Sequence, residues 1–369
     1  MNFDYNARLS RLRALLRDGV IAIALVPGAN MRYFTGLSFH LMQRPTIALI
    51  TADAFAMIIP QLEMAKLEER PDLHARAFIW SDSEGYQGAF QAAVDGLGLR
   101  GGTLGVDGMT MRVTEWLTFQ QIDPTMGVRA VERGLIAIRA VKSPEEIDAM
   151  RRAVAVSERA LARLLPEIKA GVTEREIASR LSVLMKEEGG HGESFSPAVQ
   201  FGANSALPHG SVGDRRLERG QLIIIDFGAL VDGYPADITR TFCLGEASAD
   251  IQRIFDTVLS ANRAAVAAAR PGVPMGDVDK AARDLIAAAG YGAYFIHRTG
   301  HGLGLDIHEP IPQIAAGVTD ILQPGMAFTI EPGIYLPGVG GARIEDDVVV
   351  TADGVEVLTQ FPRELVIPA

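Results

Sequence analysis

The stretch 222–242, LIIIDFGALVDGYPADITRTF, carries two acids whose spacing would bring them together. An apolar run ends on Asp226, an Asp-Gly turn follows at 232–233, and Asp237 lies in the alternation of polar and apolar residues after it. This pattern predicts a β-hairpin in which Asp226 lies opposite Thr239 and diagonal to Asp237 on the same face. Two buried carboxylates so close repel each other and lose hydration, so they need a cation or a shared proton. A solvated turn is the alternative for this stretch alone.

A second stretch repeats the first. LERGQLIIID at 217–226 and LQPGMAFTIE at 322–331 share a leucine, a glycine and a terminal acid at a constant offset of 105 residues (226 to 331). After Glu331 the chain passes through a glycine-rich loop and returns with Glu345. Such an internal repeat predicts two hairpins related by a pseudo-twofold axis, which would gather four carboxylates in one place.

Histidines lie between and before these hairpins. His297, His301 and His308 fall in the glycine-rich stretch HRTGHGLGLDIHEP, where the backbone can approach a ligand closely. His209, in SALPHG, precedes the first hairpin much as His308 precedes the second. We interpret the remaining histidines as loop, surface or packing residues: His40, His74 and His191.

Four carboxylates and an imidazole form an oxygen-rich set of donors. This set suits Mn²⁺, and also Co²⁺, Fe²⁺ or Zn²⁺, better than it suits copper. Two divalent ions would balance the charge of four carboxylates. Two such ions about 3.5–4 Å apart lower the pKa of a bridging water and polarise a carbonyl. The residues therefore predict metal-assisted hydrolysis, most plausibly of an amide.

The elements that must position these residues divide the 369-residue chain into two domains. Residues 1–133 have an amphipathic helix pattern and short strand-like runs typical of a compact α/β domain. We place a linker at 134–142 and a second domain at 143–369. That domain opens on a capping box at Ser143 with proline at the first helical position, and its two-helix unit returns at an offset of 101 residues (Gly189 to Gly290).

Composition excludes several classes of function. A net charge of −10 argues against a nucleic-acid or anionic-membrane surface. No apolar run reaches the length of about 18 residues that spans a bilayer, and the N-terminus lacks the apolar core of a secretory signal. The single cysteine, Cys243, excludes a disulfide framework and a cysteine metal site. These features predict a cytoplasmic protein.

With these motifs the chain resembles the M24 metallopeptidases of the pita-bread fold, which include methionine aminopeptidase, aminopeptidase P and prolidase. The resemblance covers essentially the whole chain, from NMRYFTGL at 30–37 through TGHGLGLDIHE and TIEPGIY to GGARIEDDVVVT. It implies an α+β fold: a pita-bread catalytic domain with an internal pseudo-twofold repeat, preceded by a smaller α/β creatinase-like domain. The family's five metal-ligand positions are unsubstituted: Asp226, Asp237, His301, Glu331 and Glu345.

The resemblance also implies a role for each of these acids and for His301. Asp226 would chelate one metal ion and His301 the other, while Asp237 and Glu345 would bridge the pair. Glu331 would bind metal and act as general base on the bridging water, so that a metal-bridging hydroxide is the nucleophile.

The other residues that match the family fall on its substrate side. His209 and His308 match histidines that would steady the scissile carbonyl and the tetrahedral intermediate during catalysis. His297 and Arg343 fall where the Xaa-Pro branch of the family, aminopeptidase P and prolidase, has further substrate-binding residues.

The first domain and the motifs SALPHG and HRTGHGLGLDIHE resemble this Xaa-Pro branch. It implies small peptide substrates with proline at the second position, neither nucleic acid nor membrane as a partner, and a homodimer. The main alternative is a non-peptidase amide hydrolase of the ectoine-hydrolase kind. Creatinase lacks the metal ligands, and the binding proteins that share this scaffold have lost them, whereas this chain has all five. A lyase that acts on a small organic acid is the remaining alternative.

Overall fold

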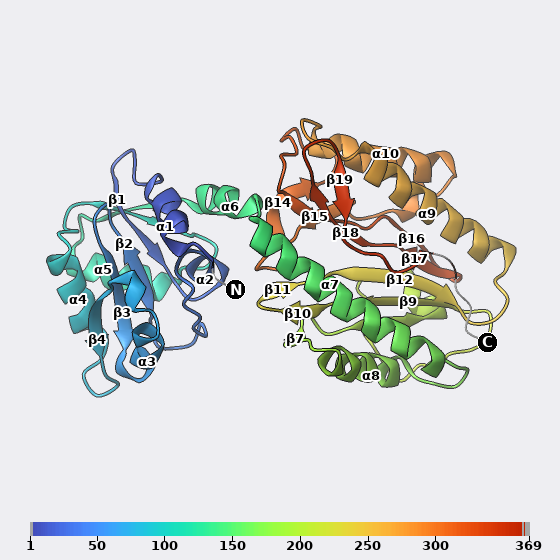
Figure 1. Ribbon diagram of the computed structural model, residues 1–369, viewed down its shortest axis with the longest axis horizontal. Coiled ribbons are helices and arrows are strands. Elements are labelled where there is room, and N and C mark those ends of the chain that lie inside the picture. The colour runs from blue at the N-terminus through green and yellow to red at the C-terminus, as the bar shows by residue number, and fades with distance from the viewer. Residues whose placement is uncertain (1–2, 364, 366–369) are drawn as a thin grey trace. The chain divides into compact units, whose positions relative to one another are not determined.

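The computed structural model describes residues 3–363 and 365, so the outermost residues of both predicted domains lie outside the described part. The described part of the chain divides into two compact units, which meet between Arg139 and Ala140 in the sequence (Figure 1). Where the sequence predicted a linker at 134–142, the structure has helix α6, Glu132–Ala140, and the division follows Arg139. The predicted domain limits themselves stay a prediction.

The N-terminal unit is an α/β layer around a six-stranded mixed sheet of order β4-β3-β2-β1-β5-β6. Its central strands are apolar runs buried at every residue in β2 and β3, which is why they occupy the middle of the sheet. The strands are β1 Val20–Leu25, β2 Ile47–Ile50, β3 Phe55–Pro60, β4 Arg76–Trp80, β5 Thr103–Val106 and β6 Gly127–Ala130. The helices are α1 Tyr5–Arg13, α2 Ala29–Thr35, α3 Met64–Glu68, α4 Gln87–Gly96 and α5 Val113–Ile122.

Two helix pairs frame the C-terminal unit. They are α7 Pro144–Leu164 with α8 Glu174–Glu187, and α9 Ala249–Ala268 with α10 Met275–Ala288. The predicted capping box begins α7: the Ser143 hydroxyl accepts the Glu146 N–H at 3.4 Å, and the Glu146 carboxylate accepts the Ser143 N–H at 3.0 Å. The same reciprocal capping begins α8 at Thr173. Strands lie between the two helix pairs (Figure 1).

The predicted first hairpin is confirmed in its register. Asp226 in β9 (Leu222–Phe227) pairs with Thr239 in β12 (Ile238–Cys243). At the tip, Val231 pairs with Tyr234 around a turn that holds Asp232 at φ 52° and Gly233 at φ 88°. Positive φ at both loop residues is the requirement that an Asp-Gly pair meets. Further strands of this half are β7 Gly192–Glu193, β8 Ala198–Phe201, β10 Ala229–Val231 and β11 Tyr234–Pro235.

The second half builds a five-stranded sheet of order β14-β13-β15-β18-β19 and a separate hairpin, β16-β17. Its strands are β13 Gly300–Gly302, β14 Glu309–Ile314, β15 Ala327–Ile330, β16 Gly333–Leu336, β17 Gly340–Arg343, β18 Asp346–Val350 and β19 Val355–Val357. The apolar face of α9, with Phe255 and Val258, belongs to the same buried cluster as Ile330 and Val348. Each such side chain contributes about 1.5–3 kcal/mol by leaving water, so this core fixes the strand ends that carry the acids. Among the described residues, no helix is both long enough and apolar enough to cross a membrane.

Candidate metal centre

The acids of the first half lie side by side at the end of their hairpin. Asp226 is near the end of β9, and Asp237 immediately precedes β12. One carboxylate oxygen of each aspartate and one of Glu345 lie within 4.8 Å of one another. Asp237 and Glu345 are buried. The diagonal arrangement expected from the hairpin register therefore brings the two aspartates together with an acid from the second half.

The second half contributes His301, Glu331 and Glu345, whose donor atoms also lie within 4.8 Å of one another. Glu331 directly follows β15, and its backbone N–H donates to the Thr299 carbonyl at 2.7 Å. Glu345 lies between β17 and β18, and its N–H donates to the Thr239 carbonyl of the first half at 3.1 Å. Backbone bonds thus hold these acids at fixed positions, and the last of them joins the two halves.

The His301 ring presents a lone pair to the acids. Its Nδ1 lies 3.0 Å from the Gly302 carbonyl, which can only accept, so Nδ1 carries the hydrogen. Burial, and next the charge of His308, lower the pKa of His301 to about 3, so the ring is neutral. Its Nε2 then faces an oxygen of Asp237 and one of Glu331, each at 3.5 Å. A lone pair facing carboxylate oxygens fits a cation between them, and the bond from Nδ1 to a carbonyl is typical of metal-binding histidines.

The acids also carry more negative charge than the protein neutralises. Burial and mutual repulsion raise the pKa of Asp237 and of Glu345 well above the ordinary range. Burial likewise raises the pKa of Glu331, to about 7. One oxygen of Asp226, Oδ1, is buried without a hydrogen-bond partner among the described residues. Crowded acids with free oxygens fit divalent cations.

Arg343 and His297 form a hydrogen-bonded chain beside the acids. The Arg343 guanidinium donates to Asp226 at 2.6 Å, to the Tyr335 hydroxyl at 2.8 Å and to the Thr239 hydroxyl at 3.1 Å. The His297 Nε2 lies 2.9 Å from the same Tyr335 hydroxyl. Arg343 is buried, so these three groups orient its charge toward Asp226.

These residues line one cavity of about 700 Å³. His209 and His308 lie on its wall and are exposed, and the His308 ring packs edge-on against the His301 ring with centroids 4.0 Å apart. Apolar side chains from Phe195, Pro208 and Ile307 line the same cavity. All the site residues expected from the sequence therefore meet in one place.

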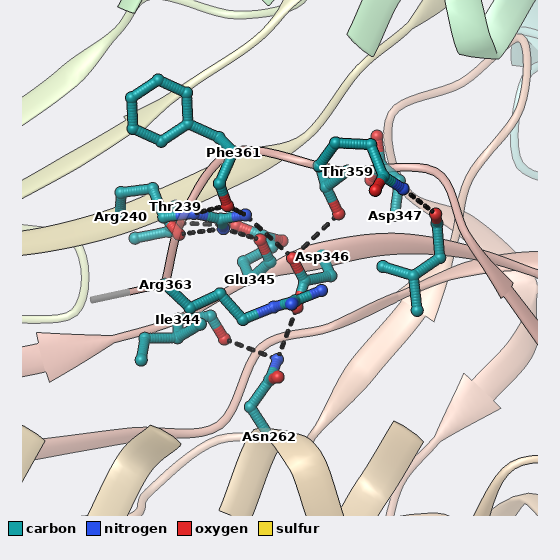
Figure 2. A network of polar contacts seen from close by, with 12 residues as sticks. Thr239, Arg240, Asn262, Ile344, Glu345, Asp346, Asp347, Thr359, Phe361 and Arg363 are labelled. Atoms are coloured by element: carbon teal, nitrogen blue, oxygen red, sulfur yellow. Dashed lines mark hydrogen bonds and ion pairs between the residues drawn. The ribbon is translucent and has the colours of Figure 1, made fainter. Parts of the chain in front are cut away.

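Behind Glu345 lies a buried polar network that the sequence analysis did not identify (Figure 2). The Thr239 hydroxyl donates to the Glu345 carboxylate at 2.6 Å, and Arg240 donates to the Glu345 carbonyl at 2.6 Å. Arg240 also pairs with Asp346 at 3.0 Å, and Arg363 pairs with the other oxygen of Asp346 at 2.7 Å. The network thus connects the backbone of a predicted metal ligand to the C-terminal segment.

Metal binding by this cluster is expected to weaken as the pH falls. Glu331, with its pKa raised to about 7, is protonated below neutrality in the metal-free protein, and a metal ion must displace that proton. His301 stays neutral and offers no competing proton. We expect the apparent affinity for Mn²⁺ to fall at least about tenfold between pH 8 and pH 6, with proton release on binding. Calorimetric titration in buffers of different ionisation enthalpy measures both, and a pH-independent affinity would contradict the prediction.

Comparison with known proteins agrees with this geometry. Residues 148–352 match metallopeptidase family M24, and residues 8–141 match the Creatinase/Prolidase N-terminal domain. The chain is 37% identical to the probable dipeptidase PepE of Mycobacterium tuberculosis (98% of this chain, 96% of that protein) and 35% identical to the Xaa-Pro dipeptidase of Pyrococcus furiosus (97% and 99%). The structure of a prolidase from Thermococcus sibiricus superposes with a TM-score of 0.93 at 35% identity, covering 99% of both chains. The resemblance in the sequence motifs is thereby confirmed: this chain belongs to metallopeptidase family M24.

Proposed function

We propose that the protein is a metal-dependent dipeptidase that hydrolyses the bond between an N-terminal residue and proline. The observation that carries the proposal is the cavity in which four acids and His301 converge, in a chain that aligns over nearly its full length with an Xaa-Pro dipeptidase. Membership of a metallopeptidase family implies divalent metal ions. The relatives named above do not favour the ectoine-type amide hydrolase.

Two divalent ions, with Mn²⁺ preferred by the oxygen-rich donors, fit the cluster best. Asp226, Asp237, His301, Glu331 and Glu345 would hold these ions, in the roles that the resemblance of the sequence motifs implies. Two ions carry a charge of four, which the four acids neutralise. When bound, such a pair lowers the pKa of a water molecule and polarises the carbonyl of the scissile bond.

Glu331 is the general base of the proposed mechanism. Its carboxylate lies on the cavity wall, 3.5 Å from the His301 Nε2, where it can take a proton from the attacking water and release it again. The proline nitrogen of a tertiary amide has no hydrogen, so it must gain a proton to leave as a secondary amine. The proton held by Glu331 is the one transferred.

The histidines and Arg343 act on the substrate in this proposal. Burial, and next the charge of Arg298, lower the pKa of His308, so its neutral ring can donate a hydrogen bond to the carbonyl oxygen as negative charge develops there. His209, on the same cavity wall, can donate a second. His297 and Arg343, which are joined through Tyr335, border the cavity on the Asp226 side.

The apolar part of the cavity accounts for the choice of proline. Phe195, Pro208 and Ile307 offer apolar surface to a pyrrolidine ring, which buries its methylene groups at about 0.8 kcal/mol each. The amide nitrogen of an Xaa-Pro bond carries no hydrogen. An apolar wall beside this bond therefore leaves no N–H group without an acceptor.

The test compares Ala-Pro, Ala-Pro-Ala and Ala-Ala-Ala as substrates of metal-stripped protein before and after addition of Mn²⁺, following release of the first residue. We expect Mn²⁺-dependent cleavage of Ala-Pro, slower cleavage of Ala-Pro-Ala and none of Ala-Ala-Ala. Preferential cleavage of the tripeptide would move the assignment to an aminopeptidase. Metal binding without cleavage of any peptide would refute a peptidase function. The homodimer and the cytoplasmic location stay predictions from the sequence.

A further inference from the structure

Arg298 is a cation in the cavity to which the mechanism above gives no contact with the substrate. Two arginines line the cavity, Arg298 and Arg343. Arg343 is buried and engaged with Asp226, Tyr335 and Thr239. The guanidinium of Arg298 is half-buried and forms no hydrogen bond or ion pair with any residue that the structure describes.

The backbone that carries Arg298 is nevertheless held firmly. Its carbonyl oxygen lies 2.8 Å from the Nδ1 of His297, and the following residue, Thr299, donates its N–H and its hydroxyl to Asp279 at 3.0 and 2.8 Å. Arg283 in turn donates to the His297 carbonyl at 2.8 Å. A side chain with no hydrogen-bond partner in the described part of the chain is thus carried by a fixed backbone at the wall of the cavity.

The position of Arg298 makes it a receptor for an anion. Its charge acts on two of the four histidines that line the cavity: after burial, it is the largest influence that lowers the pKa of His308, and it also lowers the pKa of His301. Arg343 keeps its hydrogen bond to Asp226, whereas Arg298 has no hydrogen-bonded acid among the described residues. An unpaired cation in a partly desolvated cavity is costly, and a guanidinium matches a carboxylate through two parallel hydrogen bonds.

We propose that Arg298 recognises a carboxylate of the substrate, an inference that rests on the proposed dipeptidase function. Xaa-Pro dipeptides offer that chemistry from two sources: the C-terminal carboxylate of proline, and an acidic side chain on the first residue. If Arg298 binds the C-terminal carboxylate, the enzyme should prefer dipeptides to longer peptides, whose carboxylate lies further from the scissile bond. If Arg298 binds the side chain, the enzyme should prefer Asp or Glu before proline.

The variants Arg298→Met and Arg298→Lys test this assignment. Methionine keeps much of the apolar stem and removes the charge, whereas lysine keeps the charge and loses the paired donors. Arg253→Met, at an exposed arginine of α9, is the matched control for loss of one positive charge. The substrates are Ala-Pro, Ala-Pro-amide and Asp-Pro, each measured with Mn²⁺-loaded protein whose metal content is checked first.

For the substrate whose carboxylate Arg298 binds, we expect Arg298→Met to lower kcat/KM about 10- to 100-fold. The loss should appear as a higher KM, as for removal of a charged hydrogen bond. Partial rescue by Arg298→Lys and no change in Arg253→Met are expected. A loss on Ala-Pro but not on its amide identifies the C-terminal carboxylate, and a loss confined to Asp-Pro identifies the side chain.

Two results would overturn the inference alone. One is an unchanged KM for Ala-Pro and Asp-Pro in Arg298→Met, and the other is an equal loss on all three substrates, which would place Arg298 in support of the metal centre. If the unaltered protein cleaves none of the three, the proposed function fails, and the inference fails with it.

Discussion

Replacing Glu331 with glutamine is expected to lower kcat for Ala-Pro by about 10³-fold, within the range that a positioned general base contributes. Glutamine has nearly the same shape and keeps one oxygen donor, but it cannot take up a proton. The Glu331 carboxylate lies on the cavity wall, 3.5 Å from the His301 Nε2, so its place suits a base. The measurement is steady-state hydrolysis with Mn²⁺ at saturating concentration.

The matched control is Glu246→Gln, at an exposed glutamate beyond the end of β12. It removes one negative charge without touching the cavity and should leave kcat unchanged. The metal content and the circular dichroism of Glu331→Gln should resemble those of the unaltered protein. Activity of Glu331→Gln within tenfold of normal would remove Glu331 from the role of base and leave it as a metal ligand alone.

Replacing Arg240 with leucine is expected to destabilise the protein by about 3–5 kcal/mol, as for removal of one partner from a buried ion pair. Arg240 is 1% exposed. Its guanidinium pairs with Asp346 and donates to the carbonyl oxygens of Thr239, Glu345 and Phe361, as Figure 2 shows. The leucine variant leaves these acceptors buried and short of a donor. Urea unfolding of the metal-free protein measures the loss.

Arg151→Leu is the control for this prediction, because Arg151 also forms a two-bonded pair with an acid, Glu356, but at the surface. The two side chains are 44% and 40% exposed. Water solvates both partners after the change, so the expected cost is below about 1 kcal/mol. Equal destabilisation by the two variants would show that burial of the Arg240 network has no energetic consequence.

Local signals made much of this structure predictable. The Asp-Gly pair at 232–233 sets the turn, and the alternation on either side sets the register, so the pairing of Asp226 with Thr239 could be predicted from a few adjacent residues. Helix α7 begins where its capping box and proline lie together. The convergence of the acids depended on one further signal, the internal repeat.

Features that depend on long-range packing have no local signal in the sequence. Arg240 and Asp346 are 106 residues apart, and nothing in the run Glu345-Asp346-Asp347 distinguishes the acid that faces the cavity from the acid that pairs with arginine. Strand β6, Gly127–Ala130, has a single branched apolar residue and forms because β5 offers a free edge. Arg298 does not stand out in the sequence because an arginine beside a histidine is ordinary there. Only its place in the cavity shows a cation without a hydrogen-bond partner among the described residues.

The distribution of the acids along the chain has a consequence for biosynthesis. Asp226 and Asp237 leave the ribosome long before His301, Glu331 and Glu345, which arrive with the second half. Domains generally fold as units during synthesis, the N-terminal domain first, so the unit that carries these acids folds only after its second half has emerged. The nascent first half holds only two of the five proposed donors, too few to retain an ion against water and cellular chelators. We therefore expect these residues to capture metal late, from the ions available to a completed polypeptide.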